Sequence, residues 1–156
     1  MFLTVWKYIF TIFALGYGIY TAYEDLKTKE IHATPVTINA AIGFILCDLD
    51  QKRELSNTIA CVLSVTLLLM MFCDLCKFWG SGDTKMCFQG LVLSFWWLKP
   101  ETIHACIVLV AGYMLISSSI GLITAGVAKD KHPAMGHSFL ITNVIILGIT
   151  ILIRFL

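Results

Sequence analysis

Charged side chains are scarce in this 156-residue sequence, which has 11 lysines and arginines and 10 aspartates and glutamates, or 13% of residues. A soluble domain carries about a quarter. Apolar residues make up 58% of the chain and gather in long uncharged runs. Such runs are typical of a protein that crosses a lipid bilayer several times. The net charge of +1 gives no indication of a nucleic-acid partner.

Separate domains and metal motifs are also absent from the sequence. No stretch between the apolar runs is long enough to fold alone, and there is no linker or internal repeat. The sequence has no His-Glu-x-x-His motif, and its Cys73-x-x-Cys76 has no second pair. Two packed thiols explain that pair better than a zinc or redox site does. We therefore expect one transmembrane domain over residues 1–156, with no metal and no cofactor.

Six apolar segments follow one another along the chain. They cover residues 2–23, 36–49, 57–78, 86–98, 102–128 and 138–155. The first, third and fifth are long enough for a bilayer core, which needs about 20 residues, and the sixth is near the lower limit. Segments 36–49 and 86–98 are short, so spans and re-entrant segments both stay open for them. We predict an all-α bundle of about six transmembrane helices.

Segment 102–128 is the richest in small residues, which let transmembrane helices approach closely. These residues are Gly112, Ser117, Ser118, Ser119, Gly121, Ala125 and Gly126. Their spread predicts a helix-packing role and a central place in the bundle.

Basic residues are distributed unevenly among the breaks between segments. The first, third and fifth breaks contain Lys27, Lys29, Lys77, Lys85, Lys129 and Lys131. The second and fourth contain Lys52, Arg53 and Lys99. The excess of six over three predicts that the odd-numbered breaks face the cytoplasm and that both termini face outward.

Gly80-Ser81-Gly82-Asp83 is the most informative motif in the chain. An aspartate at the end of an apolar run is costly near a bilayer. Glycines permit backbone conformations closed to other residues and allow close approach of a neighbouring chain. A glycine-rich turn whose Asp83 caps the next helix is an equally good explanation of these four residues.

Asp25 follows the first apolar segment and is the second acid of interest. Alone, it is explained by an ordinary solvated loop with mixed charges. It shares a membrane face with Asp83 only if segments 36–49 and 57–78 both cross. Two aspartates on one face are the minimum requirement for an aspartyl protease.

Three features together resemble the type IV prepilin peptidases, which are membrane aspartyl proteases of the Gly-x-Gly-Asp class. The first feature is Asp25, with lysines behind it and Ile31 six residues on. The second is Phe78-Trp79-Gly80-Ser81-Gly82-Asp83-Thr84-Lys85-Met86, which is similar to the family's aromatic-x-Gly-x-Gly-Asp-x-Lys-Leu. The third is His132-Pro133-Ala134-Met135-Gly136, at the place of the family's Pro-x-x-Gly turn before the last helix.

The resemblance implies specific roles for residues of these motifs. Asp25 and Asp83 would be the catalytic pair that activates water. The residues that would shape the motifs or position the substrate are Gly80, Gly82, Lys85, Lys27, Pro133 and Gly136. The implied partners are a prepilin or pseudopilin substrate and the lipid bilayer. The implied place is the bacterial inner membrane, where a short basic leader is cut off at the cytoplasmic face.

The sequence departs from the family pattern at several points. After Ile31 the family has Pro-Asn, and here stands His32-Ala33. His132 replaces the usual aliphatic residue before Pro133. The chain also has no room for the domain with paired Cys-x-x-Cys motifs that larger members carry. It resembles the short, peptidase-only form of tight-adherence pilus systems, so we expect no N-methyltransferase activity.

Two other functions stay open from the sequence alone. His32, His132 and His137 would lie near Asp25 and Asp83, and such groups bind transition metals, so a metal-binding carrier is one alternative. A non-catalytic membrane assembly protein is the other, and it predicts no dependence on either aspartate.

Overall fold

The computed structural model describes residues 2–28, 33–50, 53–76, 81–128 and 136–155. These residues form six helices and, within the described ranges, no strand. The helices are α1 (Phe2–Thr28), α2 (Ala33–Leu49), α3 (Arg53–Leu75), α4 (Ser81–Leu98), α5 (Ile103–Ala128) and α6 (Gly136–Phe155). The predicted all-α bundle is confirmed.

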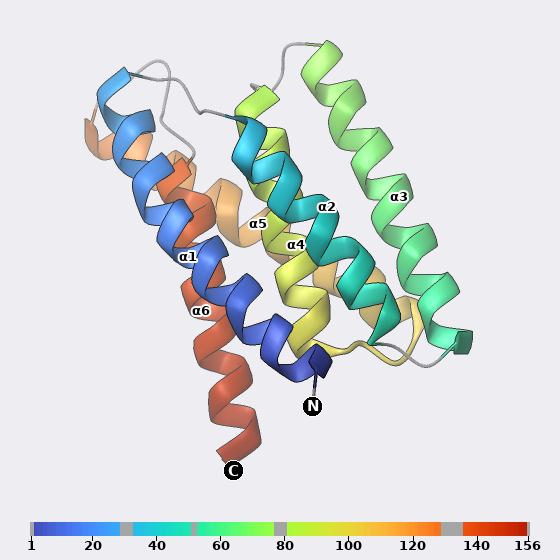
Figure 1. The fold of residues 1–156 in the computed structure, drawn as a ribbon. Helices are drawn as coiled ribbons and strands as arrows, with labels where there is room; N and C mark the ends of the chain where they lie inside the picture. The colour runs from blue at the N-terminus through green and yellow to red at the C-terminus, as the bar shows by residue number, and fades with distance from the viewer. Residues whose placement is uncertain (1, 29–32, 51–52, 77–80, 129–135, 156) are drawn as a thin grey trace.

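Successive helices run in alternating directions, as Figure 1 shows. The alternation gives the bundle two ends, which we name after one residue of each. The Asp25 end is where α1 finishes and where α4 and α6 begin, and the Lys7 end is where α1 begins and α4 finishes. Because α2 and α3 both run the length of the bundle, the end of α1 and the start of α4 lie on the same side.

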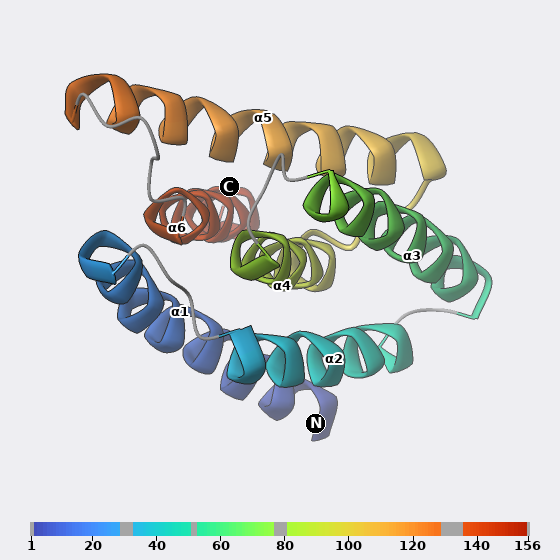
Figure 2. The same ribbon diagram turned by 90° about the horizontal axis from the view of Figure 1, so that it is seen from above.

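Helices α4 and α6 lie inside the bundle, between α1 and α2 on one side and α5 on the other (Figure 2). Every residue from Met86 to Trp97 of α4 is buried, including the polar Gln89 and Ser94. A helix enclosed by other helices meets neither lipid nor water, so it can carry polar side chains at membrane depth.

The expectation that segment 102–128 is central is wrong. Helix α5 lies at the outside of the bundle (Figure 2), and Leu122 and Val127 are 73% and 81% exposed. A Cβ at Gly112 or Gly126 would meet nothing within 4 Å. Small residues indicate close packing only where a neighbour approaches them, and the neighbours gather around α4 instead.

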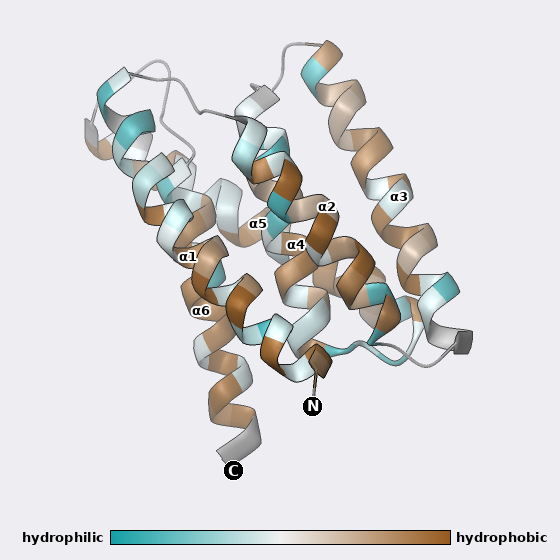
Figure 3. Cartoon of the chain, viewed as in Figure 1, coloured by the Kyte–Doolittle hydropathy of each residue, from teal (hydrophilic) through white to brown (hydrophobic). Residues whose placement is uncertain are grey.

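Within the described ranges, four helices are long and apolar enough to cross a membrane: α1 over Phe2–Asp25, α3 over Ser56–Leu75, α5 over Ile103–Thr124 and α6 over Gly136–Ile153. Helix α2 is apolar but has only 17 residues. Hydrophobic residues predominate along these helices (Figure 3), and 34 large apolar side chains of the described residues are exposed. Such a surface is stable in lipid, so the chain has the character of a membrane protein.

Glycines bring the helices of the core together at two places. A Cβ at Gly43 of α2 would lie 2.2 Å from the Phe10 ring of α1. A Cβ at Gly90 of α4 would lie 1.8 Å from the hydroxyl oxygen of Tyr113. That hydroxyl donates a hydrogen bond to Oδ1 of Asn143, 3.0 Å away, so α4, α5 and α6 meet where only a glycine fits.

Candidate active site

Asp25 lies in the last turn of α1 rather than in a loop, because the helix continues five residues beyond the apolar segment. Its side chain is only 5% exposed. The Oδ2 atom accepts a hydrogen bond from the backbone N–H of Gly136, 2.8 Å away, across 111 residues of sequence. The first N–H groups of a helix have no partner within the helix, and they favour a negative charge. Asp25 therefore caps the start of α6 from another helix.

Gly136 is suited to this contact because it has no side chain. A Cβ there would lie 3.1 Å from Oδ2 of Asp25 and 3.4 Å from the backbone Cα of Ala22. The distance to Oδ2 of Asp25 is short for a carbon atom, and the backbone of α1 at Ala22 is already at van der Waals contact. The absence of a side chain thus lets α6 begin directly against α1.

Asp83 lies in the first turn of α4, which begins at Ser81. The explanation of Asp83 as the capping residue before this helix is therefore wrong, because the residue is inside the helix. An acid in a first turn is still favoured by the helix dipole. Its side chain is partly buried at the same end of the bundle as Asp25 (Figure 1). Helices α1, α4 and α6 pack against one another in all three pairs.

Two buried hydroxyl groups lie close in sequence to these contacts. Thr84 follows Asp83 and is 4% exposed, and Ser138 in the first turn of α6 is fully buried. Within the described ranges, neither Oγ1 of Thr84 nor Oγ of Ser138 has a hydrogen-bond partner. Buried polar atoms are nearly always paired in folded proteins. These two hydroxyls are therefore buried polar groups whose pairing is incomplete among the described residues.

The other predicted motif residues are placed as follows. Lys27 is exposed in the last turn of α1, where a positive charge is favoured by the helix dipole. Gly82 and Lys85 are partly buried at the start of α4. Gly80 and Pro133 lie outside the described residues, as do Ile31, His32, Phe78, Trp79 and His132.

The described residues do not bring together three histidine, cysteine, aspartate or glutamate side chains that could hold a metal ion. Of the three histidines in the metal alternative, His137 alone is described. Its Nε2 lies 2.8 Å from Oγ1 of Thr124. This contact links the start of α6 to α5 and gives His137 a structural role beside Asp25.

A second polar cluster, at the Lys7 end, was missed by the sequence analysis. Lys7 is only 6% exposed. Its ammonium donates to the carbonyl oxygen of Trp96 at 2.7 Å and lies 4.2 Å from the centre of the Trp97 ring. The indole N–H of Trp97 donates to Thr11 at 2.9 Å. The signal was a single lysine in an apolar segment, which must find partners inside the bundle.

Asp50 completes this cluster. Its Oδ2 lies 2.8 Å from the ammonium of Lys99 and accepts a hydrogen bond from the indole of Trp96 at 3.0 Å. Burial alone would raise the pKa of Asp50, but these two hydrogen bonds and the charges of Lys99 and Lys7 together lower it below its ordinary value of 3.8. The cluster therefore holds the ends of α1, α2 and α4 together by paired charges.

Comparisons with family models, with curated proteins and with solved structures find no match for this chain.

Proposed function

We propose that this protein is a membrane aspartyl endopeptidase that removes a short basic leader from prepilin-like proteins. The observation that carries the proposal is the hydrogen bond between Asp25 and Gly136. It joins the first and third motifs of the sequence at the end of the bundle where Asp83 lies in the first turn of α4. Two acids on separate helices of one bundle end are the groups that a water-activating pair requires.

In the proposed mechanism the two carboxylates share one proton, because two nearby acids do not both ionise readily. The ionised carboxylate takes a proton from a water molecule, and the protonated one donates a hydrogen bond to the scissile carbonyl. The water oxygen then attacks the carbonyl carbon. The C–N bond breaks when the leaving nitrogen receives a proton from the pair.

The proposed setting is the inner membrane of a bacterium, with all six helices crossing and the Asp25 end at the cytoplasmic face. The bias of basic residues towards the first, third and fifth breaks supports this orientation. In this orientation the exposed Lys27 lies at the cytoplasmic surface. The substrate leader would then reach the aspartates without crossing the bilayer.

Co-expression with a prepilin-like substrate tests the proposal. The substrate needs a basic leader that ends in glycine, followed by an apolar segment. Replacing Asp25 or Asp83 by Asn removes the shared proton chemistry, so we expect each variant to abolish the loss of leader mass. Asparagine keeps an oxygen that can accept from Gly136, so the fold is retained.

Asp74→Asn is the matched control, because Asp74 is a partly buried acid in the last turn of α3, at the same bundle end. We expect this variant to process the substrate normally. Normal processing by Asp25→Asn or Asp83→Asn would show that the assigned pair is wrong.

A further inference from the structure

One polar contact in the core joins three helices at a single level of the bundle. The hydroxyl of Tyr113 on α5 donates a hydrogen bond to Oδ1 of Asn143 on α6, 3.0 Å away. Both groups lie against Gly90 of α4, where a Cβ would be 1.8 Å from the hydroxyl oxygen and 2.5 Å from Oδ1. Both side chains are buried. We call these three residues the Gly90 contact.

The Gly90 contact fits α4 in one register. Every residue of α4 from Met86 to Trp97 is buried, and within this stretch Gly90 alone has no side chain. A slip of α4 by one turn, about 5.4 Å, would bring Cys87 or Leu93 to the place where the Tyr113 hydroxyl now lies. Buried polar groups fix the register of packed helices in this way. The contact therefore sets the level of α4 relative to α5 and α6.

An identical spacing leads from this contact to the candidate active site on both helices. Asp83 precedes Gly90 by seven residues on α4. Gly136 precedes Asn143 by seven residues on α6. Seven residues make almost two turns, so each earlier residue lies on the same helix face as the later one, about 10.5 Å along the axis.

Helices α4 and α6 run in the same direction and lie side by side (Figure 1 and Figure 2). Since their faces meet at the Gly90 contact, the faces that carry Asp83 and Gly136 meet two turns closer to the Asp25 end. Gly136 donates the backbone hydrogen bond to Oδ2 of Asp25. The level of α4 relative to α6 therefore sets the position of Asp83 relative to Asp25.

We infer that Tyr113 and Asn143 are positioning residues, which hold Asp83 at the level of Asp25 through their hydrogen bond at Gly90. This inference rests on the proposed peptidase function. It adds two residues in the middle of the bundle, away from both acids, to the groups on which the proposed reaction depends. Misplacement of reacting groups by about 1 Å costs about 10²-fold in rate, so a small change of register should be measurable.

Steady-state kinetics with a prepilin-like probe test the positioning role. Tyr113→Phe removes only the hydroxyl, and Asn143→Leu replaces the acceptor by an apolar side chain of similar size. A shift of a few tenths of an ångström should lower kcat about tenfold in each variant. KM should stay unchanged, because both side chains are buried. The double variant should lose no more than either single variant, because both substitutions break the same hydrogen bond.

Two buried hydroxyls on the same helices provide matched controls. Ser117 donates to the backbone carbonyl of Tyr113 at 2.6 Å, within α5. Thr150 donates to the backbone carbonyl of Ile146 at 2.8 Å, within α6. These bonds stay within one helix, so their loss changes stability without changing register. We expect Ser117→Ala and Thr150→Val to keep the wild-type kcat, whatever their effect on the midpoint of thermal unfolding.

Crosslinking tests the alignment of the two acids without any catalysis. The Asp25→Cys/Asp83→Cys protein is treated in detergent with a short bifunctional thiol reagent. Mass spectrometry after digestion then separates the adduct between these two positions from adducts of the native cysteines. We expect this adduct to form. Its yield should fall when Tyr113→Phe is added and should not fall when Ser117→Ala is added.

Several results would overturn the positioning role and leave the peptidase function standing. One is a wild-type kcat in Tyr113→Phe and Asn143→Leu. Others are a kcat loss no larger than in Ser117→Ala and Thr150→Val, or a raised KM with an unchanged kcat. An adduct that does not form, or whose yield Tyr113→Phe leaves unchanged, would show that the Gly90 contact does not align the acids.

Failure of the peptidase function has a different signature. If the wild-type protein does not cleave the probe, or if Asp25→Asn cleaves it, that function is wrong and the positioning role falls with it. The crosslinking yields then still decide whether Tyr113 and Asn143 fix the register of α4.

Discussion

The two ends of the bundle differ in what holds their aspartates. At the Lys7 end, Asp50 lies 2.8 Å from the Lys99 ammonium and accepts from the Trp96 indole. At the Asp25 end, Asp25 accepts from the backbone N–H of Gly136. The first arrangement neutralises a carboxylate with a cation, which suits a structural clamp. The second fixes a carboxylate by a neutral backbone donor at a helix start, and the proposed function assigns this carboxylate to catalysis.

This difference shows that an aspartate near a helix end has no fixed role. Asp50 and Asp25 both follow apolar segments in the sequence. Their partners decide the outcome, since Asp50 is held by side chains from α4 and the short turn after it. Asp25 is held by the start of a helix that lies more than a hundred residues away.

Exchanging an acid for its amide at each end should separate catalysis from stability. Asp25→Asn should lower the rate of leader removal by about 10³-fold, the scale of a lost acid–base group. Asp50→Asn should keep that rate per folded molecule, because Asp50 lies at the opposite end. The measurement is the initial rate of mass loss of a prepilin-like probe in detergent. Equal loss of rate in both variants would remove the functional distinction between the ends.

Gly136→Ala should displace Asp25 without unfolding the bundle. The added Cβ meets Oδ2 of Asp25 and the Ala22 backbone at 3.1 and 3.4 Å, so the carboxylate must shift by a few tenths of an ångström. Misplacement of a reacting group by about 1 Å costs about 10²-fold in rate, so we expect a loss of about tenfold. Probe turnover at saturating substrate measures this effect.

Gly148→Ala is the control for this substitution, because Gly148 is also in α6 and a Cβ there meets nothing within 4 Å. It should keep full activity and raise helix stability by up to about 1 kcal/mol. The interpretation of the Asp25–Gly136 contact fails if Gly136→Ala is as active as Gly148→Ala.

Lys7→Met should weaken the Lys7 end. It removes the donor to the Trp96 carbonyl and the cation over the Trp97 ring. Loss of a buried charged hydrogen bond costs about 1–3 kcal/mol. We expect Lys7→Met to have a lower midpoint of thermal unfolding in detergent than the wild type. The midpoint of Lys7→Arg should lie between those of the wild type and Lys7→Met. If Lys7→Met is folded but does not cleave the probe, the Lys7 end contributes to catalysis, and the contrast between the two ends is wrong.

The stabilising effect of Asp50 should disappear in acid. Its folded-state pKa is lowered, so the ionised carboxylate stabilises the fold above its unfolded-state pKa, and this contribution is lost as the pH falls through the lower folded-state value. The difference in unfolding midpoint between wild type and Asp50→Asn should be constant near neutral pH and should close below pH 3.8. Its size should be below about 1 kcal/mol, because Lys99 is 42% exposed. A pH-independent difference would contradict the ion pair.

Much of the fold could be predicted from the sequence because lipid imposes a simple rule on composition. Each of the six apolar segments corresponds to one helix, and the bounds of the 102–128 segment and α5 differ by one residue at the start. Helices α1 and α4 extend by about one turn into polar sequence at one end, and α3 begins before its apolar segment and ends before it does. An apolar segment ends at its last apolar residue, whereas a helix continues as long as its backbone hydrogen bonds and its cap are favourable.

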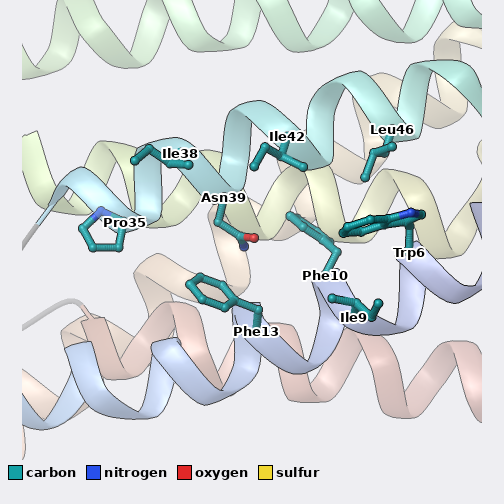
Figure 4. A pocket seen from close by; sticks show the side chains of 9 residues that line it. All are labelled: Trp6, Ile9, Phe10, Phe13, Pro35, Ile38, Asn39, Ile42 and Leu46. Atoms are coloured by element: carbon teal, nitrogen blue, oxygen red, sulfur yellow. The ribbon is translucent and has the colours of Figure 1, made fainter.

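The candidate site was predicted in part. The sequence identified Asp25, Asp83 and Gly136, and the structure brings Asp25 and Gly136 into contact and puts Asp83 at the same bundle end. The burial of Asp25 could not be predicted, because a loop of mixed charge and a capped helix end have the same composition. The apolar groove between α1 and α2, which Asn39 lines (Figure 4), could not be predicted either, because it forms only when the two helices pack.

The sequence alone determined that the chain forms apolar helices and how many there are, because transfer of each side chain into lipid depends on that residue alone. Only the tertiary structure decided which helix is central, since burial depends on neighbours. It placed α4 inside the bundle and the small-residue α5 outside. It also decided which acid is neutralised and which is held by a helix start. Such pairings join distant segments, and their energies arise only when the helices pack.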